Sequence, residues 1–177
     1  MHAHVALCPC LRALFFRQVL VLDNLCRSHA GSLERALRSA ADELQMPKQE
    51  LRRLLGFLKV DLRDKKRLEE SLRFQRFDAV IHFAGFKSVP ESLEAEELYW
   101  SNNVGGFEKL LSVLRDYAVS EAMFLSSSCT VYKPSAGQLD EDSALEPTCP
   151  YGETKHLSLK ASLEADLSWM HGCGAVS

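Results

Sequence analysis

The chain alternates short apolar runs with longer stretches in which leucines recur at helical spacing. The run QVLVLD, residues 18–23, is almost continuously apolar and ends in an acid. That pattern is typical of a parallel strand that is buried on both faces. Similar runs predict three further strands, at residues 57–62, 77–84 and 122–127.

Helical patterns fill the stretches between these strands. Residues 32–55 follow a helical pattern that Pro47 breaks, and Asp64 is placed to cap a helix that runs to Phe74. Residues 93–118 are helical around a pair of glycines, and a last helix follows Pro150. Repeated strand-then-helix units predict an α/β fold, with a parallel sheet, covering helices and right-handed crossovers.

Several chemically useful residues follow directly on the predicted strands. Ligands of open parallel sheets bind beyond the carboxyl ends of the strands. Four such positions are filled by a carboxylate, a glycine or a hydroxyl, and we expect them to lie at one crevice: Asp23, Asp61, Gly85 and Ser128.

Composition narrows the function classes. The 177 residues suit one domain, and 46% hydrophobic residues, 25% charged residues and a net charge of −3 are ordinary for a globular protein. Nucleic-acid binding would need a concentrated basic patch, whereas the basic residues at 63–67 are interleaved with acids and predict a solvated helix face. No apolar run reaches the ~18 residues of a membrane span, so we expect no membrane partner.

The cysteines and the N-terminus point to a cytoplasmic protein. The N-terminal apolar stretch is broken by Pro9, Arg12 and Arg17, which makes it a poor signal peptide. The six cysteines include no CxxC pair, so we expect no metal site and reduced thiols: Cys8, Cys10, Cys26, Cys129, Cys149 and Cys173.

The segment CPYGETK places Tyr151 and Lys155 four residues apart, on one face of a helix. A free phenol has a pKa near ~10, and a nearby ammonium lowers such a pKa towards the range of a general acid–base catalyst. Ser128, at the end of a predicted strand, could then position an alcohol substrate. The alternative is a buried aromatic beside a surface lysine, with serines that satisfy only their own backbone.

Two other polar features lie within predicted elements. His82 falls inside a strand, which favours a core histidine over a catalytic one. Asn102 and Asn103 fall inside a helical stretch, against their propensity, and predict a specific polar contact. Gly85 directly follows a strand, where a backbone without a side chain can approach a ligand closely.

Five segments follow one another along the chain in an order that matches a known family: VLDNLCRS, VIHFAGFKSVPES, YWSNNVGG, FLSSSCTVY and CPYGETK. Together they resemble the UDP-glucose 4-epimerases, a family of extended short-chain dehydrogenase/reductases, from about Val19 to Trp169. Sugar-nucleotide 4,6-dehydratases carry acidic residues after the strand-end serine or threonine, and none stands here between Ser126 and Tyr132.

The resemblance implies a Rossmann-like doubly wound parallel sheet, NAD as cofactor and a UDP-sugar as substrate. It implies interconversion of UDP-glucose and UDP-galactose, in galactose metabolism, by transient oxidation at C4. Pentose and uronate epimerases are the nearest alternatives. A homodimer through the helices around residues 93–118 and 152–167 is also implied.

The same resemblance assigns roles to residues. Tyr151 would be the acid/base at the sugar 4-hydroxyl, and Lys155 would hold the nicotinamide ribose and lower the tyrosine pKa. Ser128 would bind the 4-hydroxyl, with Cys129 and Thr130 beside the substrate. The remaining positions would contact the cofactor: Asp23, Asn24, Asp61, Leu62, Phe83, Ala84, Gly85, Lys87 and Asn103.

The two ends of the chain depart from the family pattern. A glycine-rich phosphate loop belongs about 20 residues before the ribose-binding acid, but the first glycine here is Gly31. We therefore expect an atypical segment at 1–17 and a partial NAD-binding domain at 18–177. The first strand with its loop and the C-terminal substrate domain would be missing, and Val5–Leu7 is the candidate to fill the gap in the sheet.

Two hypotheses follow from these departures. The chain is either a piece of an active epimerase or a truncated, non-catalytic domain that binds a partner. Without the phosphate contacts, we expect no measurable epimerase activity from these 177 residues alone, and NAD⁺ binding weaker than millimolar.

Overall fold

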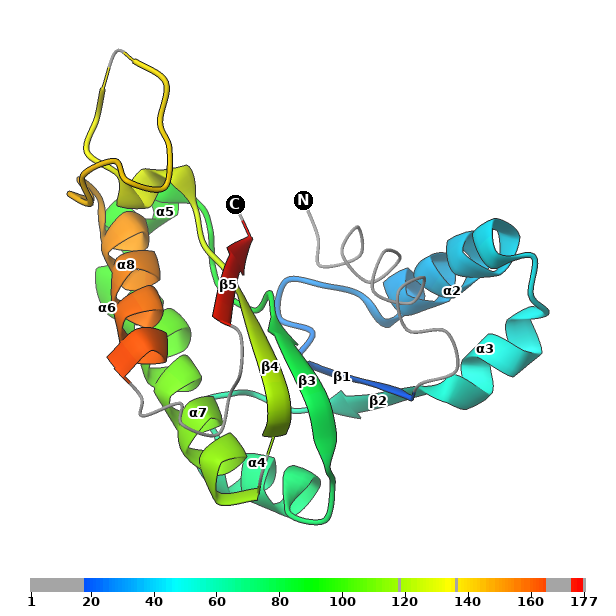
Figure 1. The fold of residues 1–177 in the computed structure, drawn as a ribbon. Helices are drawn as coiled ribbons and strands as arrows, with labels where there is room; N and C mark the ends of the chain where they lie inside the picture. Colours follow the sequence, from blue (N-terminus) through cyan, green and yellow to red (C-terminus); the bar gives the residue numbers. More distant parts are fainter. Residues whose placement is uncertain (1–17, 118, 136, 165–172, 177) are drawn as a thin grey trace. The chain divides into compact units, whose positions relative to one another are not determined.

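The computed structural model describes residues 18–117, 119–135, 137–164 and 173–176, which form a parallel α/β structure (Figure 1). The chain divides into two compact units, unit 1 (Met1–Asp61) and unit 2 (Leu62–Ser177). The segment Val5–Leu7 lies outside the described residues, as does all of 1–17. The expected division at residue 18 therefore stays a prediction.

Unit 1 is built on a pair of parallel strands joined by two helices. Its elements are β1 (Val19–Asp23), α2 (Ala30–Leu44), α3 (Lys48–Leu54) and β2 (Leu55–Lys59). Leu37 and Ala40 of α2 and Leu51 of α3 form its core, against Val19 and Leu55 of the strands. The helices therefore cover the strand pair through one apolar face each.

The second strand begins earlier than its sequence pattern predicts. We expected helix through Leu55 and a strand at 57–62, but α3 ends at Leu54 and β2 occupies Leu55–Lys59. A short apolar run fits the end of a helix and the start of a strand equally well. Here Leu55 pairs with Val19, and tertiary pairing decides the boundary.

Unit 2 contains three parallel strands in the order β3-β4-β5. Its elements are α4 (Lys65–Leu72), β3 (Phe77–His82), α5 (Val89–Glu94), α6 (Glu96–Tyr99), the π-helix η1 (Trp100–Gly105), α7 (Gly106–Tyr117), β4 (Val119–Ser126), the 3₁₀ turn η2 (Cys129–Val131), α8 (Pro150–Glu164) and β5 (Cys173–Val176). The strand β5 was not expected from the sequence.

The strand pairing follows a doubly wound sheet. The usual order of such a sheet is 3-2-1-4-5-6, in which strand 1 pairs with both strands 2 and 4. The pair β2-β1 corresponds to 3-2, and β3-β4-β5 corresponds to 4-5-6. A strand that pairs with both β1 and β3 would precede β1, in residues 1–17, which lie outside the described residues, so the expected gap in the sheet stays a prediction.

The core of unit 2 lies between its sheet and the helices α7 and α8. Phe107 of α7 packs against Met123 and Leu125 of β4, and Figure 1 shows both helices on the same side of the sheet. Side chains alternate along a strand, so Ile81 and Phe124 point to the other face, where each is 38% exposed.

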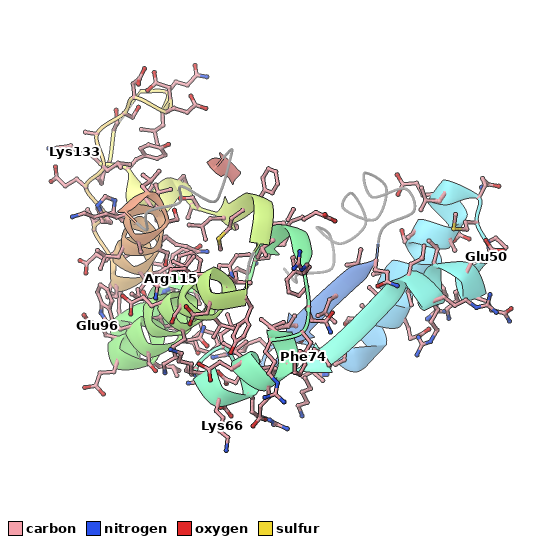
Figure 2. The ribbon with its side chains drawn as sticks, turned by 60° about the horizontal axis from the view of Figure 1, so that its bottom comes forward. Glu50, Lys66, Phe74, Glu96, Arg115 and Lys133 are labelled. Atoms are coloured by element: carbon pink, nitrogen blue, oxygen red, sulfur yellow. The ribbon has the colours of Figure 1, made fainter. Side chains whose placement is uncertain are left out.

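The helix α4 begins where the sequence indicates. The Asp64 carboxylate accepts a hydrogen bond from the Arg67 amide at 3.1 Å, which confirms the predicted cap. The helix ends at Leu72, two residues early, and the Arg73 guanidinium lies 4.7 Å from the ring centre of the exposed Phe74. Lys66 points outwards in Figure 2, as expected of a solvated helix face.

Among the described helices, none combines the length and apolar character needed to cross a bilayer.

Candidate active site

The helix α8 brings Tyr151 and Lys155 into the interior of unit 2. Only 8% of Tyr151 and 7% of Lys155 is exposed. Pro150 is the first helical residue, where its missing N–H costs nothing and its fixed φ suits a helix. The alternative of a surface lysine beside a buried aromatic is therefore wrong, because both side chains are buried.

Gly152 allows this helix to start directly against the turn η2. A Cβ at this position would lie 2.5 Å from the Thr130 carbonyl oxygen, closer than real Cβ atoms come to any atom. The contact brings the first turn of α8 to the chain just after Ser128. The sequence argument missed Gly152, although it stands inside the motif that carries Tyr151.

Lys155 is the most strongly perturbed cation of the site. Its Nζ donates to the Ser126 carbonyl oxygen at 2.7 Å, at the carboxyl end of β4. Burial lowers the pKa of Lys155 to about 8, because the ammonium has lost most of its hydration. An ammonium has three hydrogens, and this bond uses one of them.

Ser128 lies between β4 and the turn η2. Its Oγ accepts from the Thr130 amide at 3.3 Å and from the Thr130 hydroxyl at 3.0 Å. Both contacts are to a residue two positions along the chain, and they leave the hydroxyl hydrogen of Ser128 for another acceptor. Cys129, next in the chain, is exposed and free.

Asn103 of η1 ties three segments together. Its Oδ1 accepts from the Phe86 amide at 2.8 Å, and its Nδ2 donates to the Phe86 carbonyl at 2.9 Å and to the Thr154 hydroxyl at 3.2 Å. A specific polar contact was predicted for this asparagine and is confirmed. Gly85 has φ +152°, and a Cβ there would lie 3.2 Å from the Asn103 Oδ1, so the close approach needs glycine.

Two further buried hydroxyls on α8 were missed by the sequence argument. Thr154 donates to the Tyr151 carbonyl at 2.8 Å, and Ser158 donates to the Thr154 carbonyl at 2.8 Å. Both lie on the helix face of Tyr151 and Lys155, at spacings of three, four and seven residues. Small polar residues at those spacings were the signal for a buried polar face.

His82 is a core residue, as expected. It is 6% exposed, and its ring centre lies 4.8 Å from that of Phe107. Burial and the charge of Lys155 lower the pKa of His82 to about 3, so the imidazole is neutral at physiological pH. A neutral ring beside the ammonium avoids a second buried positive charge.

The loop after β3 lies at the same edge of the sheet as these groups. His82 pairs with Leu125 in the parallel register of β3 and β4, so both strands end side by side. The loop starts at the half-buried Phe83 and continues through exposed positions: Ala84, Gly85 and Lys87. In unit 2 the structure therefore brings this loop to the strand edge from which Lys155 is held.

Unit 1 carries a separate polar cluster at the ends of its two strands. The Asp23 Oδ1 accepts from the Leu25 amide at 2.6 Å and from the Ser28 hydroxyl at 2.9 Å. Asn24 donates from Nδ2 to the Asp61 Oδ2 at 2.9 Å. The predicted adenosine-side residues Asp23, Asn24 and Asp61 are thus brought together, whereas Leu62 belongs to unit 2.

No group of three potential metal ligands of the His, Cys, Asp or Glu type comes together in the described part of the chain.

A parallel α/β sheet with a buried Tyr-x-x-x-Lys pair at its carboxyl edge defines a Rossmann-like domain. Residues 6–173 match the model of the NAD dependent epimerase/dehydratase family. The chain belongs to this family.

Its relatives in sequence include two plant enzymes. UDP-glucose 4-epimerase 2 of Arabidopsis thaliana is 42% identical over 137 residues, which are 77% of this chain and 37% of the relative. UDP-glucose 4-epimerase 2 of Oryza sativa subsp. japonica is 41% identical over 140 residues, which are 79% of this chain and 32% of the relative. The chain thus spans about a third of these relatives.

Solved structures of UDP-glucose 4-epimerases are similar to nearly the whole of this chain, which covers about half of each of them. UDP-glucose-4-epimerase of Stenotrophomonas maltophila, with bound NAD and formylated UDP-arabinopyranose, has a TM-score of 0.78 at 30% identity over 98% of this chain and 48% of its own. UDP-glucose 4-epimerase of Bifidobacterium longum, in complex with NAD⁺ and UDP, has a TM-score of 0.78 at 28% identity. The match covers 97% of this chain and 49% of the Bifidobacterium chain.

Proposed function

We propose that this chain carries the acid–base site of a UDP-glucose 4-epimerase, which interconverts UDP-glucose and UDP-galactose. The observation that carries the proposal is the buried ammonium of Lys155, held 2.7 Å from the strand-end carbonyl of Ser126 on the helix face of Tyr151. Relatives that are named UDP-glucose 4-epimerases support the choice of substrate.

The donors and acceptors of the site fit NAD at two of its parts. Lys155 has two ammonium hydrogens beyond its bond to Ser126, which suits the hydroxyls of the nicotinamide ribose. In the strand-end cluster, the contacts described for Asp23 use Oδ1, which leaves Oδ2 for the adenosine ribose. The diphosphate has no matching loop, because the sequence contains no GxxGxxG.

We assign the proton transfer to Tyr151. When bound, NAD supplies the hydride acceptor and donor for the sugar C4. The 4-hydroxyl must lose its proton as C4 is oxidised and regain it afterwards, which calls for one group that does both. Tyr151 is that group, and the unused hydroxyl hydrogen of Ser128 orients the same oxygen.

The neighbouring residues are assigned to holding the two ligands. Cys129 and Thr130 lie on the turn η2 beside Ser128 and would line the sugar. The cofactor-lining positions of unit 2 are assigned to the loop after β3, to η1 and to the chain before α4: Phe83, Ala84, Gly85, Lys87, Asn103 and Leu62. Asn24 and Asp61 would contact the adenosine of the cofactor from unit 1.

A homodimer through the helices around residues 93–118 and 152–167, from the end of α5 to α7 and α8, belongs to the proposal. Large apolar side chains are exposed on these helices, which contact one another: Leu93 (66%), Leu98 (37%), Leu157 (37%) and Leu163 (67%). Exposed leucines on helices that contact one another favour association of two copies. Sedimentation should show a dimer that Leu93→Glu with Leu163→Glu converts to monomer, and a monomeric wild type would refute it.

A cytoplasmic location is also proposed, and the free thiols of Cys26, Cys129 and Cys149 support it.

A pentose 4-epimerase is the second candidate. The observation in its favour is the Stenotrophomonas structure, which holds a formylated UDP-arabinopyranose. Assaying UDP-arabinose beside UDP-glucose separates the two candidates, since the preferred substrate has the higher kcat/KM.

The proposed function is tested in a chimera. Residues 19–164 of this chain replace the matching segment of the Arabidopsis relative, which keeps its own remaining chain. We expect epimerisation of UDP-glucose, measured as UDP-galactose formed, and a loss of about 10²–10⁴-fold in Tyr151→Phe. A folded chimera with bound NAD that is inactive, or that is unaffected by Tyr151→Phe, would contradict the proposal. The isolated chain serves as the control, with no turnover expected.

A further inference from the structure

One face of the helical segment α6–η1 holds the loop after β3 by its backbone. Asn103 engages both the N–H and the C=O of Phe86, as described above. Tyr99, one turn earlier, does the same to Ser88: its Oη accepts from the Ser88 amide at 2.9 Å and lies 2.8 Å from the Ser88 carbonyl oxygen. Tyr99 and Asn103, four residues apart on one helical segment, therefore hydrogen-bond to the backbone of Ser88 and Phe86, which are two residues apart in the loop.

This arrangement imitates a neighbouring β-strand. In a sheet, the N–H and C=O of every second residue bond to the same neighbour. Phe86 and Ser88 have that spacing, and Ser88 is extended, with φ −82° and ψ 113°. Side chains of a helix thus supply, at Phe86 and Ser88, the hydrogen bonds that a neighbouring strand would supply.

Tyr99 also packs against the candidate acid–base residue. It is 0% exposed, and its ring meets that of Tyr151 edge to face, with centres 6.4 Å apart and planes at 82°. On its other side lies Phe86, at 5.6 Å between ring centres. T-shaped pairs of this kind are favourable and directional, so Tyr99 restricts where the Tyr151 ring can lie.

The hydroxyl of Tyr99 has a third partner. Glu91 Oε2 of α5 lies 3.0 Å from Tyr99 Oη. A phenol has one hydrogen, so it donates either to Glu91 or to the Ser88 carbonyl at any moment, while accepting from the Ser88 amide. The hydroxyl is therefore anchored from both the loop and the helix that follows it.

We propose that Tyr99 is a positioning residue, which fixes the loop after β3 through its hydroxyl and the Tyr151 phenol through its ring. The inference rests on the proposed function, because it assigns to Tyr99 the alignment of the acid–base residue with the loop that would line the cofactor. The contacts of Tyr99 with Ser88, with Glu91 and with the Tyr151 ring are those of a residue that acts by positioning its neighbours.

The hydroxyl half of the proposal is tested by amide hydrogen exchange in the full 177-residue chain. Tyr99→Phe keeps the ring and removes the hydroxyl. We expect exchange at the Ser88 amide to rise about tenfold, because its acceptor is lost, while the Phe86 amide stays protected by Asn103. Tyr117→Phe removes a hydroxyl elsewhere in unit 2 and should leave both amides unchanged. An unchanged Ser88 amide in Tyr99→Phe would overturn the hydroxyl role.

The ring half is tested by acetylating tyrosines with N-acetylimidazole and locating the label by mass spectrometry. Tyr99→Leu should raise the labelling rate of Tyr151 about fivefold or more, since a buried ring with one wall removed opens locally. Tyr99→Phe should restore the wild-type rate, and Tyr132 reports any general loosening. Equal rates in wild type and Tyr99→Leu, or a rise at Tyr132 that matches the rise at Tyr151, would overturn the ring role.

Neither readout uses NAD or sugar, so the two proposals fail separately. Unchanged exchange and labelling would remove the role of Tyr99 and leave the epimerase proposal intact. A chimera that binds NAD without epimerising would remove the epimerase proposal. If exchange and labelling change as expected, the role of Tyr99 would still hold. If Tyr99→Leu does not fold, as judged by circular dichroism, the Ser88 amide in Tyr99→Phe decides alone.

Discussion

Unit 1 and unit 2 each present polar residues at the carboxyl ends of parallel strands, but they hold them in different ways. In unit 1, Asp23 is satisfied by Leu25 and Ser28, within five residues of it. In unit 2, Asn103 bonds to Phe86 and Thr154, which lie 17 and 51 residues away. The strand-end cluster of unit 1 is partly exposed and includes a long-range bond that joins Asn24 to Asp61, whereas the bonds of Asn103 in unit 2 are buried and long-range.

Burial changes the ionisation of a key side chain in unit 2, whereas the carboxylates of unit 1 stay partly exposed. The pKa of Lys155 is lowered to about 8 by burial in unit 2, and that shift needs packing from several elements. The carboxylates of unit 1 keep contact with water and serve as hydrogen-bond acceptors. Substitutions should therefore cost more in unit 2 than in unit 1, and the following predictions test that ranking.

The largest expected effect is a loss of folding stability at low pH, caused by the buried His82. Its pKa is about 3 in the folded protein and 6.5 as a free group, so the unfolded chain binds more protons between these values. Stability should fall as pH drops below about 6.5, by an amount on the order of 3 kcal/mol at pH 4. Urea unfolding at pH 7 and pH 4 measures this loss, and His82→Met should lose correspondingly less. Equal losses in both proteins would contradict burial of a neutral imidazole.

Gly152→Ala should follow, with a loss of about 2–3 kcal/mol in the free energy of unfolding. A Cβ at this position lies 2.5 Å from a backbone oxygen, which has no rotamer to move away. Gly31→Ala is the matched control, because nothing lies within 4 Å of its added Cβ and it stands in a helix of unit 1. Equal stability of the two variants would show that α8 does not start against η2.

Asn103→Ala should cost about 2 kcal/mol, because it removes the side-chain bonds to the amide and carbonyl of Phe86 and one of the bonds of the Thr154 hydroxyl. The same free energy of unfolding is the measure, and exchange at the Phe86 amide should rise with it. A loss under about 0.5 kcal/mol would mean that the loop is held by other contacts.

Asn24→Ala in unit 1 should have the smallest effect, below about 1 kcal/mol. Its bond to Asp61 is half-buried, and water can replace the lost donor. Comparing the two asparagine variants under one set of conditions tests the contrast between the units directly. A larger loss for Asn24→Ala than for Asn103→Ala would reverse it.

The local features of this fold could be predicted from the sequence. The cap at Asp64, the strand runs and the Tyr151–Lys155 helix depend on neighbouring residues, and the structure has them. The boundary at Leu55 and the strand β5 could not be found this way, because pairing with a distant strand decides both. Gly152 was missed for the same reason: the atom that forbids its Cβ belongs to Thr130.

The candidate site also contains residues that could be predicted from local sequence and residues that could not. Motif spacing pointed to Tyr151 and Lys155, asparagine in a helical stretch pointed to Asn103, and all three are buried. The polar partners on α8 and the hydrogen bonds of Tyr99 to Ser88 depend on how the segment α6–η1 packs against two other segments. A helical pattern does not encode such packing, and the π-helix that contributes to it gives no separate sequence signal.

The most direct test is the titration of the Lys155 side chain, followed by NMR in the chain labelled with ¹³C-lysine and assigned with Lys155→Met. One lysine signal is expected to titrate near pH 8 and to disappear in the variant. If Lys155 instead titrates with the other lysines near ~10.4, its ammonium is solvated and the acid–base site proposed for unit 2 does not exist.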